Sequence, residues 1–415
     1  MYKQETLSSV EEFTPTQSGH FPSWLTQLIW ERPPLDPTRE DPVEFHLIYE
    51  EHPQYPEGIT HFLIIAPHLC TDARAGTRLM DEISQIYAHF EELVSINQDL
   101  FTSWDMSDSR SPDEDSKPTF TPIPLESSNQ LSLPSLPPVS LINQDLLDLK
   151  YPSFRAKWKS ILHGTFKCVK DLFQSAQGLD LPNKSRGKTG VYAYRVTPSE
   201  LQHVLQAARK AKVTAHVLFT WALTQMYARN HKKHHSSASS IPLFRVADLF
   251  SLCPWLPQDA QNQFEILIQP YTTTLNPQWT TEEAFQTINK RLKRYKEGEV
   301  LSEIPRVRLY TFFARIFSYP SLKKQLLKRI FKTNITTTNP GRVPAQFKSF
   351  GSHKCIDFIN FPQIAPPARL GIIYTTFQNE LRIMSVYDQA LFTHTEIEEF
   401  TSELWNTIKK LADEI

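Results

Sequence analysis

Two histidine–aspartate pairs in this sequence have the spacing HxxxD, one from His68 to Asp72 and one from His353 to Asp357. A neutral imidazole can take a proton near pH 7, which makes histidine the usual general base, and a nearby carboxylate can orient the chain around it. A chain with 14 His predicts about 0.6 chance occurrences of this spacing. The elements around each pair therefore decide which of them could be a site.

The first pair has the better context. Residues 61–66, HFLIIA, read as a buried strand, and from Arg74 onward apolar residues recur at helical spacing. His68 then closes a strand at a sheet edge, where a cleft can form, and Asp72 opens a long helix, where a carboxylate suits the helix dipole. The second pair precedes Pro362, Pro366 and Pro367, which exclude a helix. We therefore take His68 as the candidate base.

The elements before His68 form a predicted hairpin. In residues 43–50, alternate positions are apolar, which predicts a half-buried strand with one inward face: Val43, Phe45, Leu47 and Tyr49. Pro56 to Gly58 is the expected turn into the strand that ends before His68.

The second half of the chain has clear helix starts. Thr197 with Glu200, Thr280 with Glu283, and Thr393 with Glu396 each have the spacing of a capping box. A further helix is expected from Thr214, and residues 370–388 predict a hairpin around Gln378-Asn379. Strands and helices mix without a regular βαβ rhythm, which predicts an α/β fold with mixed sheets rather than a doubly wound parallel sheet.

The length and composition of the chain limit its domain number, its location and the classes of chemistry it could perform. A chain of 415 residues favours two subdomains, which we place at 1–190 and 191–415, with a Ser/Pro-rich irregular segment at 102–140. A net charge of −1 gives no indication of nucleic acid binding. Four cysteines without a CxxC pair indicate a reducing, cytoplasmic location, and no apolar run could span a bilayer. The absence of GxGxxG, GxxxxGK[ST] and GxSxG argues against dinucleotide, P-loop and α/β-hydrolase chemistry.

The order of these pieces resembles the chloramphenicol acetyltransferase-like superfamily. That superfamily includes peptide-synthetase condensation domains, plant BAHD acyltransferases, and polyketide-associated and alcohol acyltransferases. The strand–HxxxD–helix unit is similar to its active-site segment. Four later segments are similar to its later elements: AKVTAHVLFTWALTQMYARN (211–230), IPLFRVADL (241–249), TTTNPGRVP (336–344) and the hairpin and helix that begin with LGIIYTTF.

The resemblance implies two subdomains with a central tunnel and an acyltransferase of secondary metabolism. The acyl group would pass from a coenzyme A or phosphopantetheinyl thioester, as co-substrate, to a small alcohol or amine, without a metal or other cofactor. A carrier protein could be a partner. His68 would be the base, Asp72 would pair with Arg245, and Asn339 with Gly341 would form the family's turn.

The chain departs from the family pattern in two places beside the motif. Pro67 stands where the family often has a second histidine, and Ala73 stands where a glycine often follows the aspartate. The section before His68 is also short. An alternative therefore stays open, in which a non-catalytic or cyclase-like relative uses the cleft as a binding pocket.

Residues 304–356 carry eleven Lys or Arg and no acidic residue. One interpretation is the solvated basic face of packed helices. Another is an electropositive entrance for coenzyme A phosphates or an acidic carrier protein, with donor-binding side chains at Lys323, Lys324, Lys328 and Arg329. A third is contact with an anionic membrane surface.

Two smaller features admit a chemical reading that we do not favour. Cys70 could be a nucleophile or a metal ligand, but nothing supplies a further orienting group, and a packed small side chain is the simpler interpretation. Residues 231–235, HKKHH, could bind a metal, but the serines that follow indicate a solvated polar link.

Overall fold

The computed structural model describes residues 3–6, 19–21, 25, 28, 43–52, 55–66, 73–96, 153, 155, 158–159, 162, 166, 176–179, 181–182, 184–235, 241–255, 268–302, 333–360, 364 and 368–415. Its helices are α2 (Ala73–Ile96), α6 (Pro198–Lys210), α7 (Ala215–His234), α8 (Thr281–Lys296) and α11 (His394–Asp413). Its strands are β1 (Lys3–Thr6), β2 (Gly19–His20), β3 (Glu44–His52), β4 (Tyr55–Ile65), β5 (Ala176–Gln177), β6 (Thr189–Val196), β7 (Leu243–Ser251), β8 (Ile268–Leu275), β9 (Ile335–Arg342), β10 (Ser349–Phe350), β11 (His353–Lys354), β12 (Leu370–Phe377) and β13 (Glu380–Asp388).

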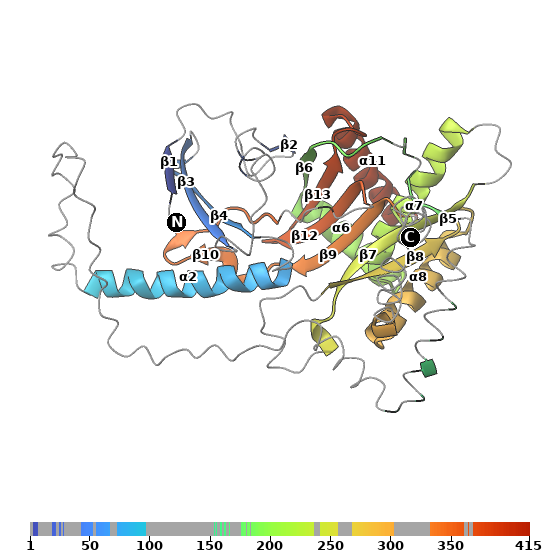
Figure 1. Cartoon of the computed structure of the whole chain (residues 1–415), viewed down its shortest axis with the longest axis horizontal. Coiled ribbons are helices and arrows are strands. Elements are labelled where there is room, and N and C mark those ends of the chain that lie inside the picture. The colour runs from blue at the N-terminus through green and yellow to red at the C-terminus, as the bar shows by residue number, and fades with distance from the viewer. Residues whose placement is uncertain are drawn as a thin grey trace, which may run out of the picture.

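Of the three sheets in the described part of the chain, two are large enough to organise it, and the third is the two-stranded β10–β11 pair (Figure 1). The larger has eight strands in the order β2–β6–β13–β12–β9–β7–β5, with β8 also paired to β7. Strand β9 runs parallel to β7 and β12, whereas β13 is antiparallel to β12 and β6. The smaller sheet, β1–β3–β4, lies beside α2 in the first half of the chain. The predicted mixed α/β class is confirmed. The subdomain division at residues 190 and 191 stays a prediction.

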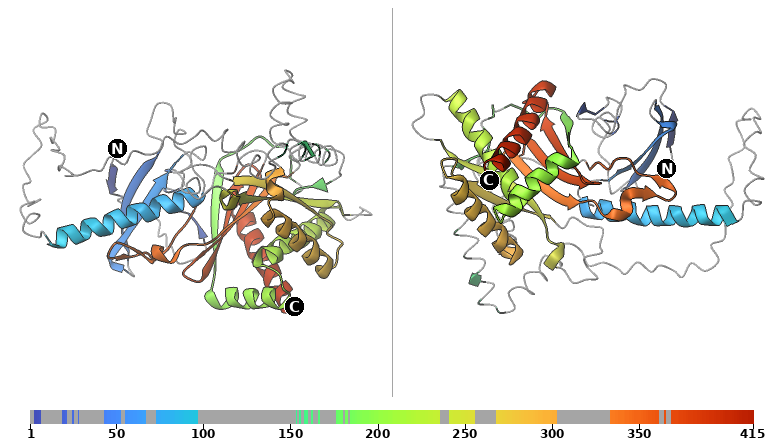
Figure 2. Two further views of the ribbon diagram at one scale, coloured as in Figure 1. Left: turned by 90° about the horizontal axis from the view of Figure 1, so that it is seen from below. Right: turned by 180° about the vertical axis from the view of Figure 1, so that it is seen from behind.

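Helices α6, α7, α8 and α11 cover one face of the large sheet (Figure 2). Their apolar sides pack on alternate residues of the strands beneath, such as Val246 and Ile372. Trp221 of α7 and Trp405 of α11 are fully buried in this layer. The helix predicted from Thr214 is confirmed as α7, and four of its large apolar residues are buried: Val217, Leu218, Trp221 and Met226.

The opposite face of the large sheet packs against the first half of the chain. Phe21 and Leu25 are buried there, and Leu63 of β4 packs against the same cluster. The cluster's members from the large sheet are Val191, Ala193, Ile373, Met384 and Val386. This face is therefore the junction between the two halves.

In the second half of the chain, the predicted capping boxes and the predicted hairpin turn are present. At Thr197, Thr280 and Thr393 the hydroxyl accepts a hydrogen bond from the third helical backbone N–H, and the glutamate there accepts one from the threonine N–H, so each is a complete capping box. Gln378 and Asn379 both have positive φ, at 48° and 70°, as a tight two-residue hairpin turn requires. These predictions are confirmed.

The first hairpin is confirmed, but two details of its prediction are wrong. Strands β3 and β4 are antiparallel neighbours, and the chain reverses between His52 and Tyr55, so Pro56 to Gly58 lie within β4. The inward face of β3 is also the other one. Phe45, Leu47 and Tyr49 are 36–50% exposed, and the buried residues are His46, Ile48 and Glu50.

Polar partners explain why the face of β3 that carries His46 and Glu50 can be buried. His46 Nε2 lies 3.2 Å from Glu44 Oε2, and His61 Nε2 lies 2.7 Å from Glu50 Oε2. Each buried polar group thus has a partner on the same hairpin, which offsets the cost of removing it from water. Apolar alternation alone does not reveal such pairing.

A segment of the second half reaches back onto α2. Phe350 of β10 contacts Phe62 and Tyr87, with ring centroids 5.3 and 5.2 Å apart. The backbone N–H and the hydroxyl of Ser352 donate to the carboxylate of Glu91, at 2.6 and 2.8 Å. These hydrogen bonds, led by that of the backbone, lower the pKa of Glu91. The segment therefore ties α2 to the large sheet.

In the described part of the chain, no helix is both long and apolar enough to cross a membrane.

We expect Thr393→Ala to lower the free energy of unfolding by about 1 kcal/mol, because it removes the cap of α11. In the present structure, Thr393 Oγ1 accepts from the Glu396 N–H at 3.2 Å. Urea denaturation followed by circular dichroism measures the change. Thr395→Ala is the matched control, since Thr395 is an exposed residue of the same first turn, and its effect should stay within about 0.5 kcal/mol. Equal losses in both variants would contradict the capping role.

Candidate functional site

The elements that hold the first HxxxD pair are placed as predicted. Strand β4 ends at Ile65 and α2 begins at Ala73, so the predicted strand before the motif and the predicted helix after it are confirmed. His68, Cys70 and Asp72 lie outside the described residues, as do Lys323, Lys324, Lys328 and Arg329. Their roles stay predictions.

Arg245 lies at the junction of the two halves. Its neighbours on β7, Phe244 and Val246, belong to the helix-side core, so its own side chain leaves the opposite face of the sheet, toward the first half. It is 1% exposed, and its Nε donates to Thr274 Oγ1 at 3.3 Å. A guanidinium buried this deeply is expected to neighbour a carboxylate. The predicted pairing with Asp72 fits this position.

The Asn-x-Gly turn has the predicted geometry at the end of β9. The Gly341 N–H donates to Asn339 Oδ1 at 3.0 Å, and Gly341 has a φ of +87°. Leu249 of β7 lies opposite Thr338 of β9, which places Asn339 five residues further along the sheet than Arg245. At about 3.3 Å per residue that is roughly 16 Å. The structure therefore does not bring these two predicted site residues together.

The second HxxxD pair is not a site of the first kind. The His353 side chain is 71% exposed, near Glu91 of α2, and the described residues that follow it, 354–360, include no helix. We preferred His68 to His353 because we expected a helix only after the first pair. The structure agrees with that difference between the two pairs.

Asp357 is instead part of a buried charge network that the sequence did not predict. Its Oδ1 accepts from Arg382 Nη2 at 3.0 Å, and Arg382 Nη1 donates to Glu380 Oε2 at 3.0 Å. Arg195 of β6 pairs with the same glutamate. Burial raises the pKa of Asp357, and the Arg382 charge opposes that rise. Arg382 was detectable as a charged residue between the apolar Leu381 and Ile383, but its partner Asp357 is 25 residues away.

Asp248 is the centre of a second unpredicted cluster, on the helix side of the sheet. The carboxylate is 3% exposed and accepts from the hydroxyls of Thr273 and Thr337. His216 Nε2 lies 3.4 Å from its Oδ1. Burial, with a smaller contribution from Asp248, raises the pKa of Tyr374. The sequence signal was a carboxylate at an inward position of β7, which needs buried partners.

The HKKHH segment differs from its predicted structure. Residues 231–234 form the last turn of α7 rather than a loop, and His231 is buried. Its ring packs on Tyr227 and His235, with centroids 5.9 and 4.5 Å apart. His231 lies four residues after the buried Tyr227, on the same side of α7, which explains why one histidine is inside.

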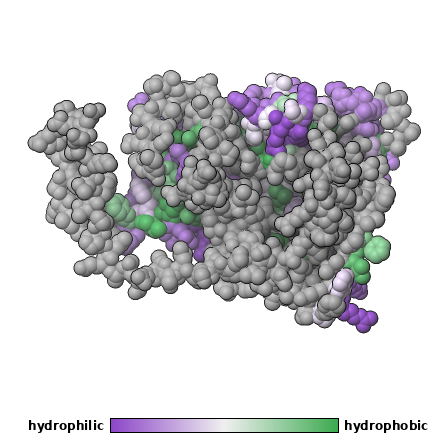
Figure 3. All heavy atoms as spheres, viewed as in Figure 1, coloured by the Kyte–Doolittle hydropathy of each residue, from purple (hydrophilic) through white to green (hydrophobic). Residues whose placement is uncertain are grey.

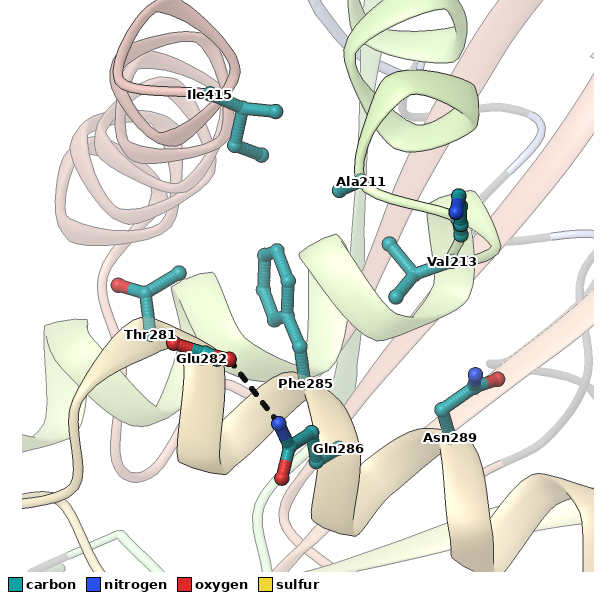
Figure 4. Close-up of a pocket in the computed structure, with 9 residues that line it drawn as sticks. Ala211, Val213, Thr281, Glu282, Phe285, Gln286, Asn289 and Ile415 are labelled. Carbon is teal, nitrogen blue, oxygen red and sulfur yellow. Dashed lines mark hydrogen bonds between the residues drawn. The ribbon is translucent and has the colours of Figure 1, made fainter.

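A hollow of about 520 Å³ opens on the helix side of the molecule (Figure 4). It lies between the α6–α7 turn, α8 and Ile415, and Phe285 forms its floor beside Glu282 and Gln286. This position is away from the junction of the two halves. The hollow is therefore not the predicted tunnel, which stays a prediction.

No protein-family model and no curated protein sequence matches the chain. Solved structures do match its fold. The epimerization domain from the third module of tyrocidine synthetase B superposes with a TM-score of 0.58 at 11% identity, over 100% of this chain and 79% of that one. The first condensation domain of the CDA synthetase gives 0.58 and 11%, over 99% and 74%. TRI3 trichothecene 15-O-acetyltransferase from Fusarium sporotrichioides gives 0.58 and 15%, over 90% and 70%.

Identities of 11–15% establish the fold and leave the chemistry open. The expected similarity to condensation domains and chloramphenicol acetyltransferase-like enzymes is confirmed at that level. The chain has the two-subdomain α/β fold that these condensation-type domains share with the trichothecene acetyltransferase.

Proposed function

We propose that the chain is an acyltransferase that moves an acyl group from a coenzyme A or carrier-protein thioester to a hydroxyl or amine, with His68 as general base. One observation carries the proposal: β4, which directly precedes the HxxxD motif in the sequence, packs through Leu63 on the face of the large sheet toward which Arg245 is directed. Solved structures of this fold include an O-acetyltransferase and condensation domains.

The chemistry needs one positioned base. The acceptor hydroxyl or amine attacks the thioester carbonyl while the His68 imidazole takes its proton. The tetrahedral adduct then collapses, the carbon–sulfur bond breaks, and the imidazolium returns the proton to the leaving thiolate. The thioester is already activated, so the step requires no covalent acyl-enzyme.

Asp72 and Arg245 support this base without touching substrate. A carboxylate at the start of α2, paired with a buried guanidinium on β7, would fix the corner that carries His68. The burial of Arg245 and its direction toward the first half support this assignment.

A second function remains a candidate, because the same fold includes domains with other roles. One neighbour is an epimerization domain, and another is the X-domain from teicoplanin biosynthesis, which is also known in complex with OxyB. A binding or rearranging protein would hold ligand without transfer. Mass-spectrometric screening of acyl-CoA donors against mixed alcohols and amines separates the two, since only a transferase yields acylated acceptor.

We expect His68→Ala to lower the transfer rate by about 10²–10⁴-fold, which is the usual contribution of a positioned general base. The thermal unfolding curve of the variant should match that of the wild type. His353→Ala is the matched control, because it removes the exposed histidine of the other HxxxD pair and should leave turnover unchanged. Wild-type turnover in a folded His68→Ala protein, or a larger loss in the control, would exclude His68 as the base.

We expect Asp72→Ala and Arg245→Ala each to lower the free energy of unfolding by about 3–5 kcal/mol, because either change leaves the other charge buried without its partner. The double variant should lose less than the sum of the two. Denaturation of the three variants and the wild type closes this cycle. Strictly additive losses would show that the two residues do not interact.

The basic residues of 304–356 are proposed to attract the anionic thioester donor. Reversing Lys323, Lys324, Lys328 and Arg329 to glutamate should raise the KM for a coenzyme A donor with little change in kcat, which is the pattern of lost uniform binding. The effect should weaken with added salt, since exposed charges are screened over about 10 Å at 0.1 M. The acceptor KM serves as the internal control. A donor KM that is unchanged at low salt would argue that the donor binds elsewhere.

A further inference from the structure

Two histidines that are 374 residues apart in the sequence meet at the edge of the large sheet. His20 lies in β2, the edge strand that pairs with β6, and His394 is the first residue of α11. Their Nδ1 atoms are 3.1 Å apart, and their ring centroids are 4.4 Å apart. The contact therefore joins an early segment of the chain to its last helix.

Two tyrosines complete this cluster. The Tyr387 hydroxyl forms a hydrogen bond with the same Nδ1 atom of His394, and the Tyr192 ring packs on His20 with its centroid 4.8 Å away. Burial raises the pKa of both phenols, that of Tyr192 to about 12, so neither carries a charge near neutral pH. The two imidazoles are therefore the groups of the cluster that can change charge in the physiological range.

The surroundings of the pair disfavour a positive charge. Burial lowers the pKa of His20, and the charge of His394 lowers it further. Backbone hydrogen bonds and Glu398, which lies one turn further along α11, oppose this lowering, each by less. At His394, the start of a helix is unfavourable for a cation. The folded chain therefore favours the neutral form of the pair.

The contact between the two Nδ1 atoms requires that at least one of them has no proton. An N–H of one ring can then donate to the lone pair of the other. When both rings are protonated, each directs an N–H at the other, and two positive charges are in contact. His394 is exposed, and α11 begins at the top of the view in Figure 1, where Figure 3 shows hydrophilic residues at the surface. Protons from solvent can therefore reach the pair.

Backbone pairing and apolar burial also hold β2 in place. The strand pairs with β6 at two positions. Phe21, directly after β2, and Leu25 are buried on the face of the large sheet that packs against the first half. Backbone pairing and apolar burial involve no group that titrates near neutral pH. The imidazole pair is therefore the part of this attachment that acid can remove.

We propose that the His20–His394 pair is a pH-sensitive switch, which holds β2 on the large sheet when it is neutral and releases β2 when both rings are protonated. Because the attached state lowers the pKa of His20, the stabilisation is complete above the ordinary histidine value of 6.5 and is lost as the pH falls below it. Release of β2 would loosen the burial of Phe21 and Leu25, so the switch would regulate how tightly the two halves are joined. It is independent of the acyl-transfer proposal.

Hydrogen–deuterium exchange of the full-length chain measures this attachment and requires no activity. The readout is the protection factor, corrected for intrinsic exchange rates, of the peptic peptide that contains His20 and Phe21. We expect it to fall by at least about tenfold between about pH 7.5 and about pH 5.5, since like charges in contact near a protein surface repel by more than the free energy of a tenfold change. Peptides from β12 and β13 should keep their protection, which would show that the fold survives.

The decisive variants are His20→Gln and His394→Gln, because each leaves a single imidazole and removes the repulsion. We expect either variant to show similar protection of this peptide at both pH values. His203→Gln is the matched control. His203 is a histidine with a 51% exposed side chain that pairs with Asp413 of α11, and its replacement should leave the wild-type pH dependence intact.

The proposal is overturned if wild-type protection is the same at both pH values, or if both glutamine variants lose protection in acid as the wild type does. If glutamine detaches β2 even at neutral pH, the imidazole signals in NMR spectra of the wild type decide. The His20 ring should take its proton below pH 6.5 and in step with the loss of protection. A ring that is protonated at a higher pH, or without a change in protection, would also overturn the proposal.

Discussion

The large mixed sheet has to be buried on both faces, and that constraint arranges the rest of the molecule. Strands such as β12 and β13 are buried at nearly every position, so neither face is left to water. Four helices of the second half cover one face, and the first half of the chain covers the other. The junction between the halves is therefore a consequence of burying the second face.

The two faces are not chemically alike. The helix side is largely apolar, and its buried polar groups include Asp248 with its hydroxyl and imidazole neighbours and the pair of Ser385 and Thr401. The side toward the first half includes the buried guanidiniums of Arg245 and Arg382. Buried charges are stable only with charged or hydrogen-bonding partners. They therefore fix the positions of the strands and loops that supply those partners. Arg382 does this for the segment of Asp357, which leads back to α2.

A reacting group at the junction would have two advantages. It would be held by rigid strands from both halves, and it would be shielded from bulk solvent, where a general base is most effective. Strand β4, which precedes the HxxxD motif in the sequence, packs at this junction through Leu63. The fold is compatible with transfer, epimerization and binding alike, so the identity of the side chains at the corner has to decide the function.

Local interactions are what the sequence by itself determined. Each capping box joins residues three positions apart, and the Gln378-Asn379 turn joins adjacent strands, so the information sits within a few residues. The strand before His68 and the helix after Asp72 follow equally from short-range periodicity. The mixed sheet class could be predicted because no regular βαβ rhythm was present.

Long-range pairings were decided only by the tertiary structure. Which face of β3 is buried depends on the partners of His46 and Glu50, and the apolar alternation indicated the wrong face. The Asp357–Arg382 pair joins residues 25 apart, and Thr337 reaches Asp248 across 89 residues. The sequence shows that such groups are charged or polar, but burial and pairing arise when distant segments meet. For this reason the Asn339 turn could be recognised from the sequence, whereas its separation from Arg245 could not.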